Sequence, residues 1–394
     1  MSLQSSLDDI LGRAAAQGSV PGVVAMVTDR SHNLYEGAFG QRVLGSDLGS
    51  SGAMTTDTVG WIASMTKAIT GAACMQLVEQ GKLHLDSPAK AVVPRLGECQ
   101  VLEGFDAAGQ PVMRAPKRDI TLRHLLTHTA GFGYEFWDAD TGRYQAATGT
   151  PGIISCSRAA MMQPLVFDPG ERWLYGINID WAARMVEAVS GQTIGQYLQQ
   201  HLLGPLGMSE TAFQIRPDQR SRLAKIHHRG DDGALVAGDL EIEQHPEHEM
   251  AGGGLYGTVG DYMHFIRMML NQGRASSGAQ VLQPETVQLM SHNAMGPLRV
   301  TNLPTQAPPL TLDAEFFPGV EKSWGLSFQI NEAPTDTGMP AGGLMWCGLA
   351  NSYFWIDQTT GIGGAYLTQI LPFADSKSLP LFYAFQSATY KALR

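Results

Sequence analysis

The chain is 394 residues long, with 44% apolar and 16% charged residues, which is enough for two or more domains around a large core. Its 45 glycines indicate many turns and, with the apolar content, exclude a disordered or fibrous protein. The net charge of −10, without a block rich in Lys and Arg, argues against a nucleic-acid partner and against an anionic membrane surface.

The N-terminal residues and the cysteines predict a cytoplasmic location. The first ten residues contain no basic segment followed by an apolar one, so we expect no secretory signal, and no apolar run is long enough to span a membrane. The four cysteines are widely separated and form no pairs of the kind that bind metals, so we expect reduced thiols. They are Cys74, Cys99, Cys156 and Cys347.

Apolar periodicity predicts strands at both ends of the chain and helices between them. Strands are expected at residues 23–28, 35–40, 324–330, 343–347, 352–356 and 364–370, and helices near 10–17, 64–78, 179–189, 197–203, 259–270 and from 379. Residues 83–174 hold short helical pieces and long loops, which predict an inserted, mostly helical subdomain. The expected fold class is therefore α/β of the α+β type, an antiparallel sheet flanked by helices and formed by residues 1–82 and 175–394.

The segment Ser64-Met-Thr-Lys67 is the strongest candidate for chemistry. Residues three apart in a helix share a face, with Cβ atoms about 5–6 Å apart. A lysine whose pKa is lowered by burial and by positive potential can take the proton of a serine hydroxyl, which is otherwise a weak nucleophile. A second copy, Ser87-Pro-Ala-Lys90, contains a proline and is more typical of a surface connection.

Tyr175 is the candidate for passing a proton to the leaving group. It follows the turn Asp168-Pro-Gly and precedes the helix predicted at 179–189, where the chain returns from the inserted subdomain. From the local sequence alone, a half-buried tyrosine with a structural hydrogen bond is the more frequent interpretation. The choice depends on the rest of the chain.

Five motifs in order resemble those of the class C β-lactamase-type serine hydrolases of the penicillin-binding-protein superfamily and, within them, the family VIII carboxylesterases. They cover nearly the whole chain, and the segments 101–106 and 175–181 also look like the fungal acyltransferases that attach the statin side chain. The motifs are Ser64-Met-Thr-Lys67, Ile120 to Gly131, Asp168-Pro-Gly to Tyr175, Gly204-Pro-Leu-Gly-Met208 and Ala251-Gly-Gly-Gly-Leu-Tyr256.

This resemblance implies a β-lactamase/transpeptidase-like fold and a role for each matching residue. Ser64 would be the acylated nucleophile, with Lys67 and Tyr175 as coupled general base and acid. The third family element matches Trp346-Cys-Gly348, so the oxyanion hole would consist of the backbone N–H groups of Ser64 and Leu349. Gly348 lets this strand approach the substrate closely. No metal and no organic cofactor is implied.

Two departures favour a neutral, apolar acyl ester. β-Lactamases have a lysine where this chain has Trp346, and an asparagine where it has Ile177, with Asn178 one place out of register. Both changes remove polar recognition of a substrate. Further aromatic residues occur in the loops expected to form the pocket, and ordinary core packing remains their alternative interpretation. They are Tyr134, Phe136, Trp137 and Trp173.

Competing motifs fail in their context. Residues 252–257 fit the spacing of a dinucleotide-binding loop, but a polar stretch precedes them instead of a strand. His245 and His248 are expected in a solvated loop, and His124 and His128 lack the glutamate of a helical zinc motif, so structural hydrogen bonds are favoured for the latter pair. No Gly-x-Ser-x-Gly motif is present.

The sequence therefore predicts a serine carboxylesterase that hydrolyses short- to medium-chain acyl esters through a Ser64 acyl-enzyme. Its partner would be a small-molecule ester, with a homodimer left open. The alternatives are an acyltransferase that passes the acyl group to an alcohol, a weak β-lactamase or D-Ala peptidase, and a relative that binds a ligand without catalysis.

Overall fold

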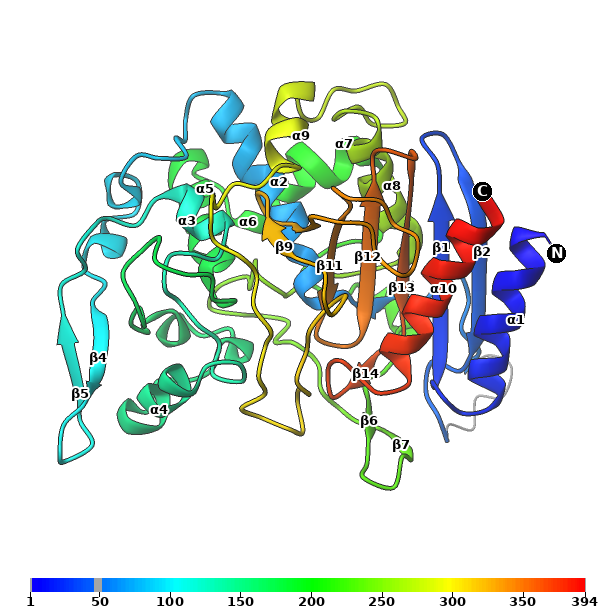
Figure 1. The fold of residues 1–394 in the computed structure, drawn as a ribbon, viewed down its shortest axis with the longest axis horizontal. Coiled ribbons are helices and arrows are strands. Elements are labelled where there is room, and N and C mark those ends of the chain that lie inside the picture. Colours follow the sequence, from blue (N-terminus) through cyan, green and yellow to red (C-terminus); the bar gives the residue numbers. More distant parts are fainter. Residues whose placement is uncertain (1, 46–51, 394) are drawn as a thin grey trace.

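An antiparallel sheet of seven strands occupies the right half of the molecule in the view of Figure 1. The computed structural model describes residues 2–45 and 52–393. The strand order is β2-β1-β13-β12-β11-β10-β9, and each neighbouring pair is antiparallel. The strands are β1 (Gly22–Thr28), β2 (Asn33–Gly40), β9 (Lys322–Trp324), β10 (Gln329–Asn331), β11 (Leu344–Gly348), β12 (Ser352–Asp357) and β13 (Ile362–Leu367).

The two ends of the chain meet within this sheet. Strand β1 pairs with β13, so that Val24 lies opposite Leu367. The terminal helices α1 (Leu3–Ala16) and α10 (Ser378–Leu393) pack against each other and cover one face, where Figure 1 shows α10 in front of the strands. Helix α8 (Val259–Leu270) packs on β1, β12 and β13 from the other side. The predicted fold class, a sheet flanked by helices, is confirmed.

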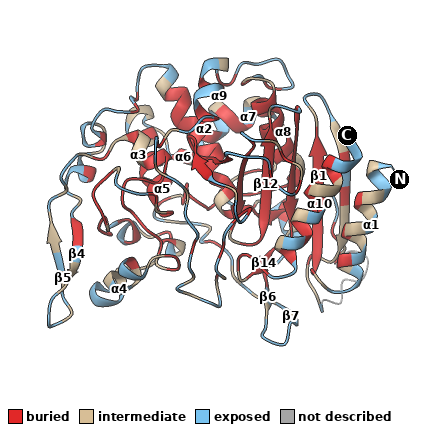
Figure 2. Cartoon of the chain, viewed as in Figure 1, coloured by how far each residue is buried: buried red, intermediate tan, exposed pale blue. Residues whose placement is uncertain are grey.

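Helix α2 (Thr66–Glu79) is buried around almost its whole circumference (Figure 2). Its residues from Thr66 to Leu77 are all buried, as expected for a helix without a polar face. Small residues permit this, since a Cβ on Gly71 would lie 2.4 Å from the hydroxyl oxygen of Ser327. The helix packs on α5 (Asn178–Ser190), and its first residues therefore sit on a rigid support.

Residues 83–174 contain short helices and one hairpin that the sequence did not lead us to expect. Strands β4 (Val101–Phe105) and β5 (Pro111–Arg114) project from the body of the molecule (Figure 1). Their turn is held by the carboxylate of Asp106, which accepts from the N–H groups of Ala108 and Gln110. The helices here are η3 (Ala89–Ala91), η4 (Pro94–Gly97), α3 (Leu122–Leu126), α4 (Ala139–Thr148), η5 (Ile153–Ser155) and η6 (Arg158–Met161).

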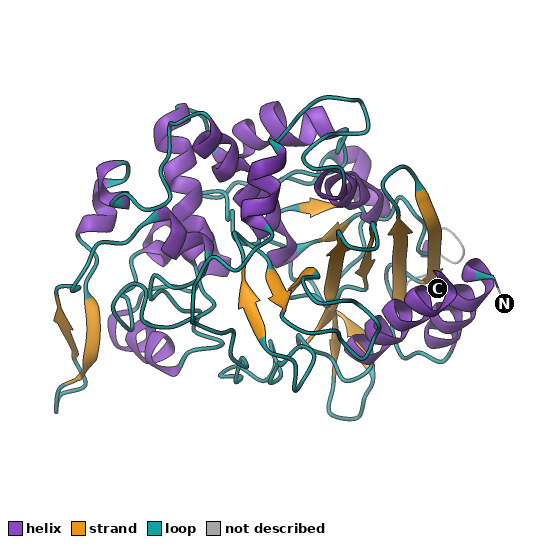
Figure 3. Cartoon of the chain, turned by 45° about the horizontal axis from the view of Figure 1, so that its top comes forward, coloured by secondary structure: helices purple, strands orange, loops and turns teal. Residues whose placement is uncertain are grey.

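Helices surround the strands of the molecule, and long loops join the elements (Figure 3). None of the helices in the described ranges combines the length and the apolar character needed to cross a bilayer. The remaining elements are α6 (Ile194–Leu198), η7 (Gln199–Leu203), α7 (Gly204–Leu206), η8 (Pro217–Arg222), α9 (Pro284–Met290), β3 (Gly60–Trp61), β6 (His227–Arg229), β7 (Leu235–Ala237), β8 (Tyr256–Gly257) and β14 (Ile370–Leu371).

Two predicted strands are wrong in extent. The run 324–330 is not one strand, because it turns between β9 and β10 at Ser327, whose φ is +82°. The run 364–370 likewise turns at Gln369, with φ +67°. The side-chain amide of Gln369 accepts from the N–H of Trp61 and donates to its carbonyl, at 2.8 and 2.9 Å. This turn thus fixes the segment that leads to Ser64.

Candidate active site

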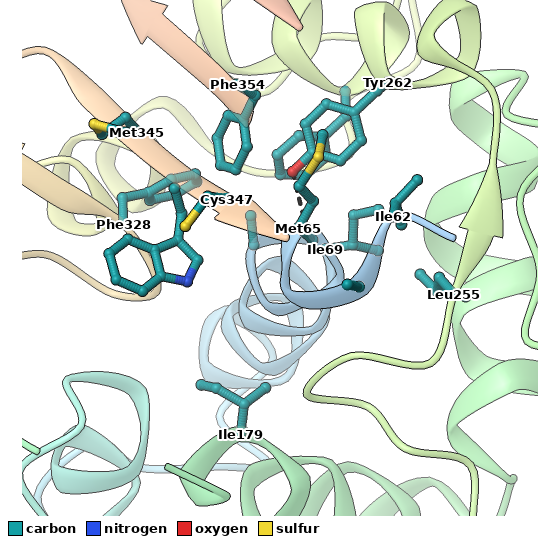
Figure 4. Packing of buried hydrophobic residues seen from close by; sticks show 14 of the residues in the cluster. Ile62, Met65, Ile69, Ile179, Leu255, Tyr262, Phe328, Met345, Cys347 and Phe354 are labelled. Atoms are coloured by element: carbon teal, nitrogen blue, oxygen red, sulfur yellow. Dashed lines mark hydrogen bonds between the residues drawn. The ribbon is translucent and has the colours of Figure 1, made fainter. Parts of the chain in front are cut away.

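Ser64 lies in the single turn η2 (Ala63–Met65), directly before α2. The residue before it, Ala63, has φ +45°, a left-handed conformation that costs a non-glycine residue energy and is frequent at functional sites. Figure 4 shows the packing that holds this turn: Met65 and Ile69 point into a cluster with Tyr262 and Phe354. The hydroxyl of Tyr262 also donates to the Met65 carbonyl at 3.0 Å.

Lys67 is fully buried, and its amino group contacts three oxygen atoms. The Nζ atom lies 3.0 Å from Ser64 Oγ, 3.0 Å from the hydroxyl of Tyr134 and 2.5 Å from the carbonyl oxygen of Gly252. Burial lowers the pKa of Lys67 to about 7, against the opposing charge of Asp180. The amine can therefore be neutral near pH 7 and accept the proton of the Ser64 hydroxyl.

Tyr175 lies on the other side of Ser64. Its hydroxyl accepts from the indole N–H of Trp346 at 2.9 Å, and it is also hydrogen-bonded to Ser64. The Lys67 Nζ lies 4.6 Å from the centre of its ring. Burial raises the pKa of Tyr175 well above its ordinary value, while the hydrogen bonds to Ser64 and Trp346 act against that rise. A neutral tyrosine in this position is suited to donate a proton.

The end of β11 approaches the turn that carries Ser64. A Cβ on Gly348 would lie 2.4 Å from the Ile62 carbonyl oxygen and 3.1 Å from the Ala63 Cβ, so only glycine allows this contact. Ser64 and Leu349 line the same hollow. In the described part of the chain, neither backbone N–H of these two residues donates to another group. Both are available to stabilise a negatively charged oxygen.

The hollow over Ser64 has an almost entirely apolar wall. Three of the aromatic residues predicted for it, Tyr134, Phe136 and Trp137, do line it. Trp173 and Ile177 do not: Trp173 packs against Trp324, and Ile177 is fully buried at the start of α5. The full lining is Trp61, Ala63, Ser64, Tyr134, Phe136, Trp137, Ile153, Ile154, Tyr175, Met250, Gly252, Gly253, Leu303, Trp346, Cys347, Leu349 and Phe373.

The other motifs lie outside this site. Ser87 is exposed, and Lys90 pairs with Asp119 at 2.7 Å. His124 caps α3 through its Nδ1 atom, and His128 contacts the side-chain amide of Asn178 at 3.1 Å. His245 is exposed, whereas His248 is buried rather than solvated. Within residues 2–45 and 52–393, no group of three or more His, Cys, Asp or Glu is placed to hold a metal ion.

The family model described as Beta-lactamase matches residues 7–387. The chain belongs to the β-lactamase family. Within this family, it is 32% identical over 391 residues to the monacolin J acid methylbutanoyltransferase of Aspergillus terreus, with 96% of this chain and 93% of that protein covered. It is 30% identical to the lovastatin esterase of Penicillium rubens, with 98% of each covered.

A solved structure of this family has the same architecture along the whole chain. It is a variant of the simvastatin synthase from Aspergillus terreus, with a TM-score of 0.85 at 30% identity, covering 98% of this chain and 96% of that one. The protein is thus a serine-hydrolase-type enzyme with the β-lactamase-like fold. Among its relatives are proteins named as transferases and one named as an esterase.

We predict that Tyr134→Phe lowers kcat for ester turnover about fivefold, because losing one buried hydrogen bond to Lys67 costs about 1 kcal/mol and leaves its amino group less well positioned. The measurement is kcat with a p-nitrophenyl ester, beside the melting temperature. Tyr256→Phe is the matched control, since its buried hydroxyl accepts from Ile242 N–H at 2.9 Å and has no hydrogen bond to Lys67 among the described residues. An equal loss of kcat in both variants would contradict a specific role for Tyr134.

Proposed function

We propose that this protein is an acyltransferase that moves a small apolar acyl group from an ester to an alcohol, with hydrolysis as its side reaction. The hollow over Ser64 carries this proposal. Among the described residues, its wall contains no Asp, Glu, Asn, Gln, Arg or Lys side chain. A water molecule has few groups to orient it there, whereas an apolar alcohol is held by burying its own surface.

The relatives support the same choice. The protein named as a methylbutanoyltransferase and the one named as an esterase match this chain to a similar extent, and the transferase is the more similar of the two. We therefore place transfer ahead of the hydrolysis expected from the sequence alone. The proposed reacting groups, Ser64, Lys67 and Tyr175, are still those expected of a family VIII carboxylesterase.

The proposed reaction has two half-reactions on one serine. Lys67 takes the proton of Ser64 as Oγ attacks the ester carbonyl, and the N–H groups of Ser64 and Leu349 stabilise the oxyanion. Tyr175 donates its proton to the departing alkoxide and recovers one from Lys67. The acceptor alcohol then loses its proton to the same pair, attacks the acyl-enzyme and releases Ser64, which regains its proton.

A charged β-lactam is a poor fit for this site. Trp346 stands in the strand position from which β-lactamases hold the substrate carboxylate with a lysine, and its indole N–H is already used by Tyr175. Its ring is buried against Trp324, at 4.6 Å between centroids. The wall near Ser64 is therefore apolar where a carboxylate would need a cation.

The test measures how the acyl group divides between water and an alcohol. A p-nitrophenyl ester of a branched short-chain acid is the donor, with a cyclic aliphatic alcohol as the acceptor. We expect more than half of the acyl group as the new ester at millimolar alcohol, and nitrocefin turnover about a hundredfold slower than ester turnover. Free acid as the sole product at every alcohol concentration would reject transfer and leave hydrolysis.

A polar residue in the wall tests the observation that carries the proposal. Leu303 lines the hollow and is 5% exposed, so Leu303→Gln should lower the ratio of transfer to hydrolysis. Leu289→Gln is the matched control, because Leu289 is exposed on α9. An unchanged ratio in Leu303→Gln would mean that the apolar wall does not select the acceptor.

We also propose that the enzyme acts in the cytoplasm on small-molecule esters, either as a monomer or as a homodimer. Its cysteines support the location, because all four are free thiols in the structure and three of them are buried.

A further inference from the structure

Asp180 is a buried carboxylate with no part in the two half-reactions above. It lies in the first turn of α5 and is fully buried. Its Oδ1 atom accepts from the N–H of Gly252 at 2.9 Å, whereas Oδ2 has no hydrogen-bond partner in the described part of the chain. A buried carboxylate costs several kcal/mol unless another charge compensates it. A group that compensates the buried charge of Asp180 should therefore lie nearby.

Gly252 connects Asp180 to Lys67. Its N–H donates to Asp180, and its carbonyl oxygen accepts from the Lys67 amino group at 2.5 Å. No side chain fits at this position: a Cβ would lie 2.4 Å from Asp180 Oδ2 and 3.3 Å from the Tyr134 hydroxyl. The Asp180 carboxylate therefore holds Gly252 in place, and the carbonyl of Gly252 accepts the hydrogen bond from Lys67.

Asp180 also supplies the carboxylate charge that acts on Lys67. Burial lowers the pKa of Lys67, and the charge of Asp180 is the largest opposing influence. The buried imidazole of His128 also interacts with Lys67, and burial together with Lys67 pushes its pKa well below the ordinary value, so it stays neutral. The other groups around Lys67 are polar without a fixed charge: Ser64, Tyr134, Tyr175 and the thiol of Cys347.

We propose that Asp180 is a positioning residue: through Gly252 it holds the carbonyl that anchors Lys67, and its charge sets the pH range in which Lys67 acts as a base. This inference rests on the proposed roles of Ser64 and Lys67. Asp180 does not line the hollow and does not reach the substrate. It therefore affects the chemical step and leaves substrate binding alone.

Asp180→Asn tests this role, because asparagine keeps an oxygen for the Gly252 N–H and removes the charge. Without the charge, the protonated form of Lys67 is less stable, so kcat should persist to lower pH. We expect the midpoint of the acid limb of kcat to fall by about one pH unit, with KM within about twofold of the wild type. The assay measures kcat and KM with a p-nitrophenyl ester between about pH 5 and pH 9.

Asp261→Asn is the matched control. Asp261 is also a buried carboxylate in the first turn of a helix, α8, but it accepts from the Thr211 hydroxyl and the Glu210 N–H, away from Lys67. Its replacement should leave the midpoint in place. A shift of the same size in Asp261→Asn would show a general effect of losing buried charge and would overturn the inference.

Gly252→Ala is a second variant that keeps the carboxylate. The added Cβ pushes Asp180 away and moves the carbonyl that anchors Lys67. The midpoint of the acid limb should therefore fall again, and kcat should be lower than in Asp180→Asn. If Asp180→Asn lacks a cooperative unfolding transition, this variant decides. If the midpoint does not move in any folded variant, the role of Asp180 is rejected. If the wild type shows no ester turnover, or a turnover that persists in Ser64→Ala, the proposed function is rejected instead.

Discussion

Replacing Ser64 by alanine should reduce ester turnover by at least about a thousandfold, because no other hydroxyl can form the acyl-enzyme. Lys67 Nζ lies 3.0 Å from Ser64 Oγ, and Tyr175 bonds to the same hydroxyl, so both proton-transfer groups converge on this atom. The measurement is the rate of p-nitrophenol release, together with mass spectrometry of the protein after a short exposure to the ester.

The wild type should gain the mass of one acyl group, whereas the Ser64→Ala protein should gain none. Ser87→Ala serves as the control, because it removes the serine of the other Ser-x-x-Lys segment, which is exposed. We expect full turnover in Ser87→Ala. Turnover that survives in Ser64→Ala, or labelling of a different residue, would end the proposed mechanism.

Lys67→Met should reduce kcat by about a thousandfold and also change how stability depends on pH. The pKa of Lys67 is about 7 in the folded protein, compared with 10.5 for an ordinary lysine. Between these two pH values the unfolded chain binds a proton that the folded chain lacks. The free energy of unfolding therefore gains a contribution that rises with pH in this window, at up to about 1.4 kcal/mol per pH unit.

Below pH 7 both states hold the proton, and the cost of burying the charged amine is then constant. Urea titrations of wild type and Lys67→Met at several pH values would measure the difference in slope. Lys90→Met is the control, since Lys90 lies on the surface beside Asp119 and should change neither slope nor kcat. Equal slopes in wild type and Lys67→Met would mean that burial does not lower the pKa of Lys67.

The sequence predicts contacts between residues that are close together in the chain. Ser64 and Lys67 lie three residues apart at the start of a helix, and this spacing alone predicts that their side chains meet. The sheet was also predictable, because its strands are apolar runs at the two ends of the chain with clear turns between them. The contact between Tyr175 and Trp346, which are far apart in sequence, could be inferred only through the resemblance to a family.

The rest of the site depends on packing that no local pattern records. Tyr134 was assigned to the pocket wall as an aromatic residue, yet its hydroxyl contacts Lys67 directly. Ile153, Leu303 and Phe373 come from three distant segments, and each is typical of an ordinary core residue. Asp180 sits in a helix where a carboxylate in the first turn is usual, so its burial gave no signal in the sequence.

The pairing of β1 with β13 has a consequence for the synthesis of this protein. Strand β1 ends at Thr28 and its partner begins at Ile362, so the long stretch of chain between them leaves the ribosome before the two can join. Until then one edge of β1, which is apolar and buried in the finished molecule, has unpaired backbone groups that can associate with another chain. We therefore expect slow, late folding and a requirement for chaperones at high expression.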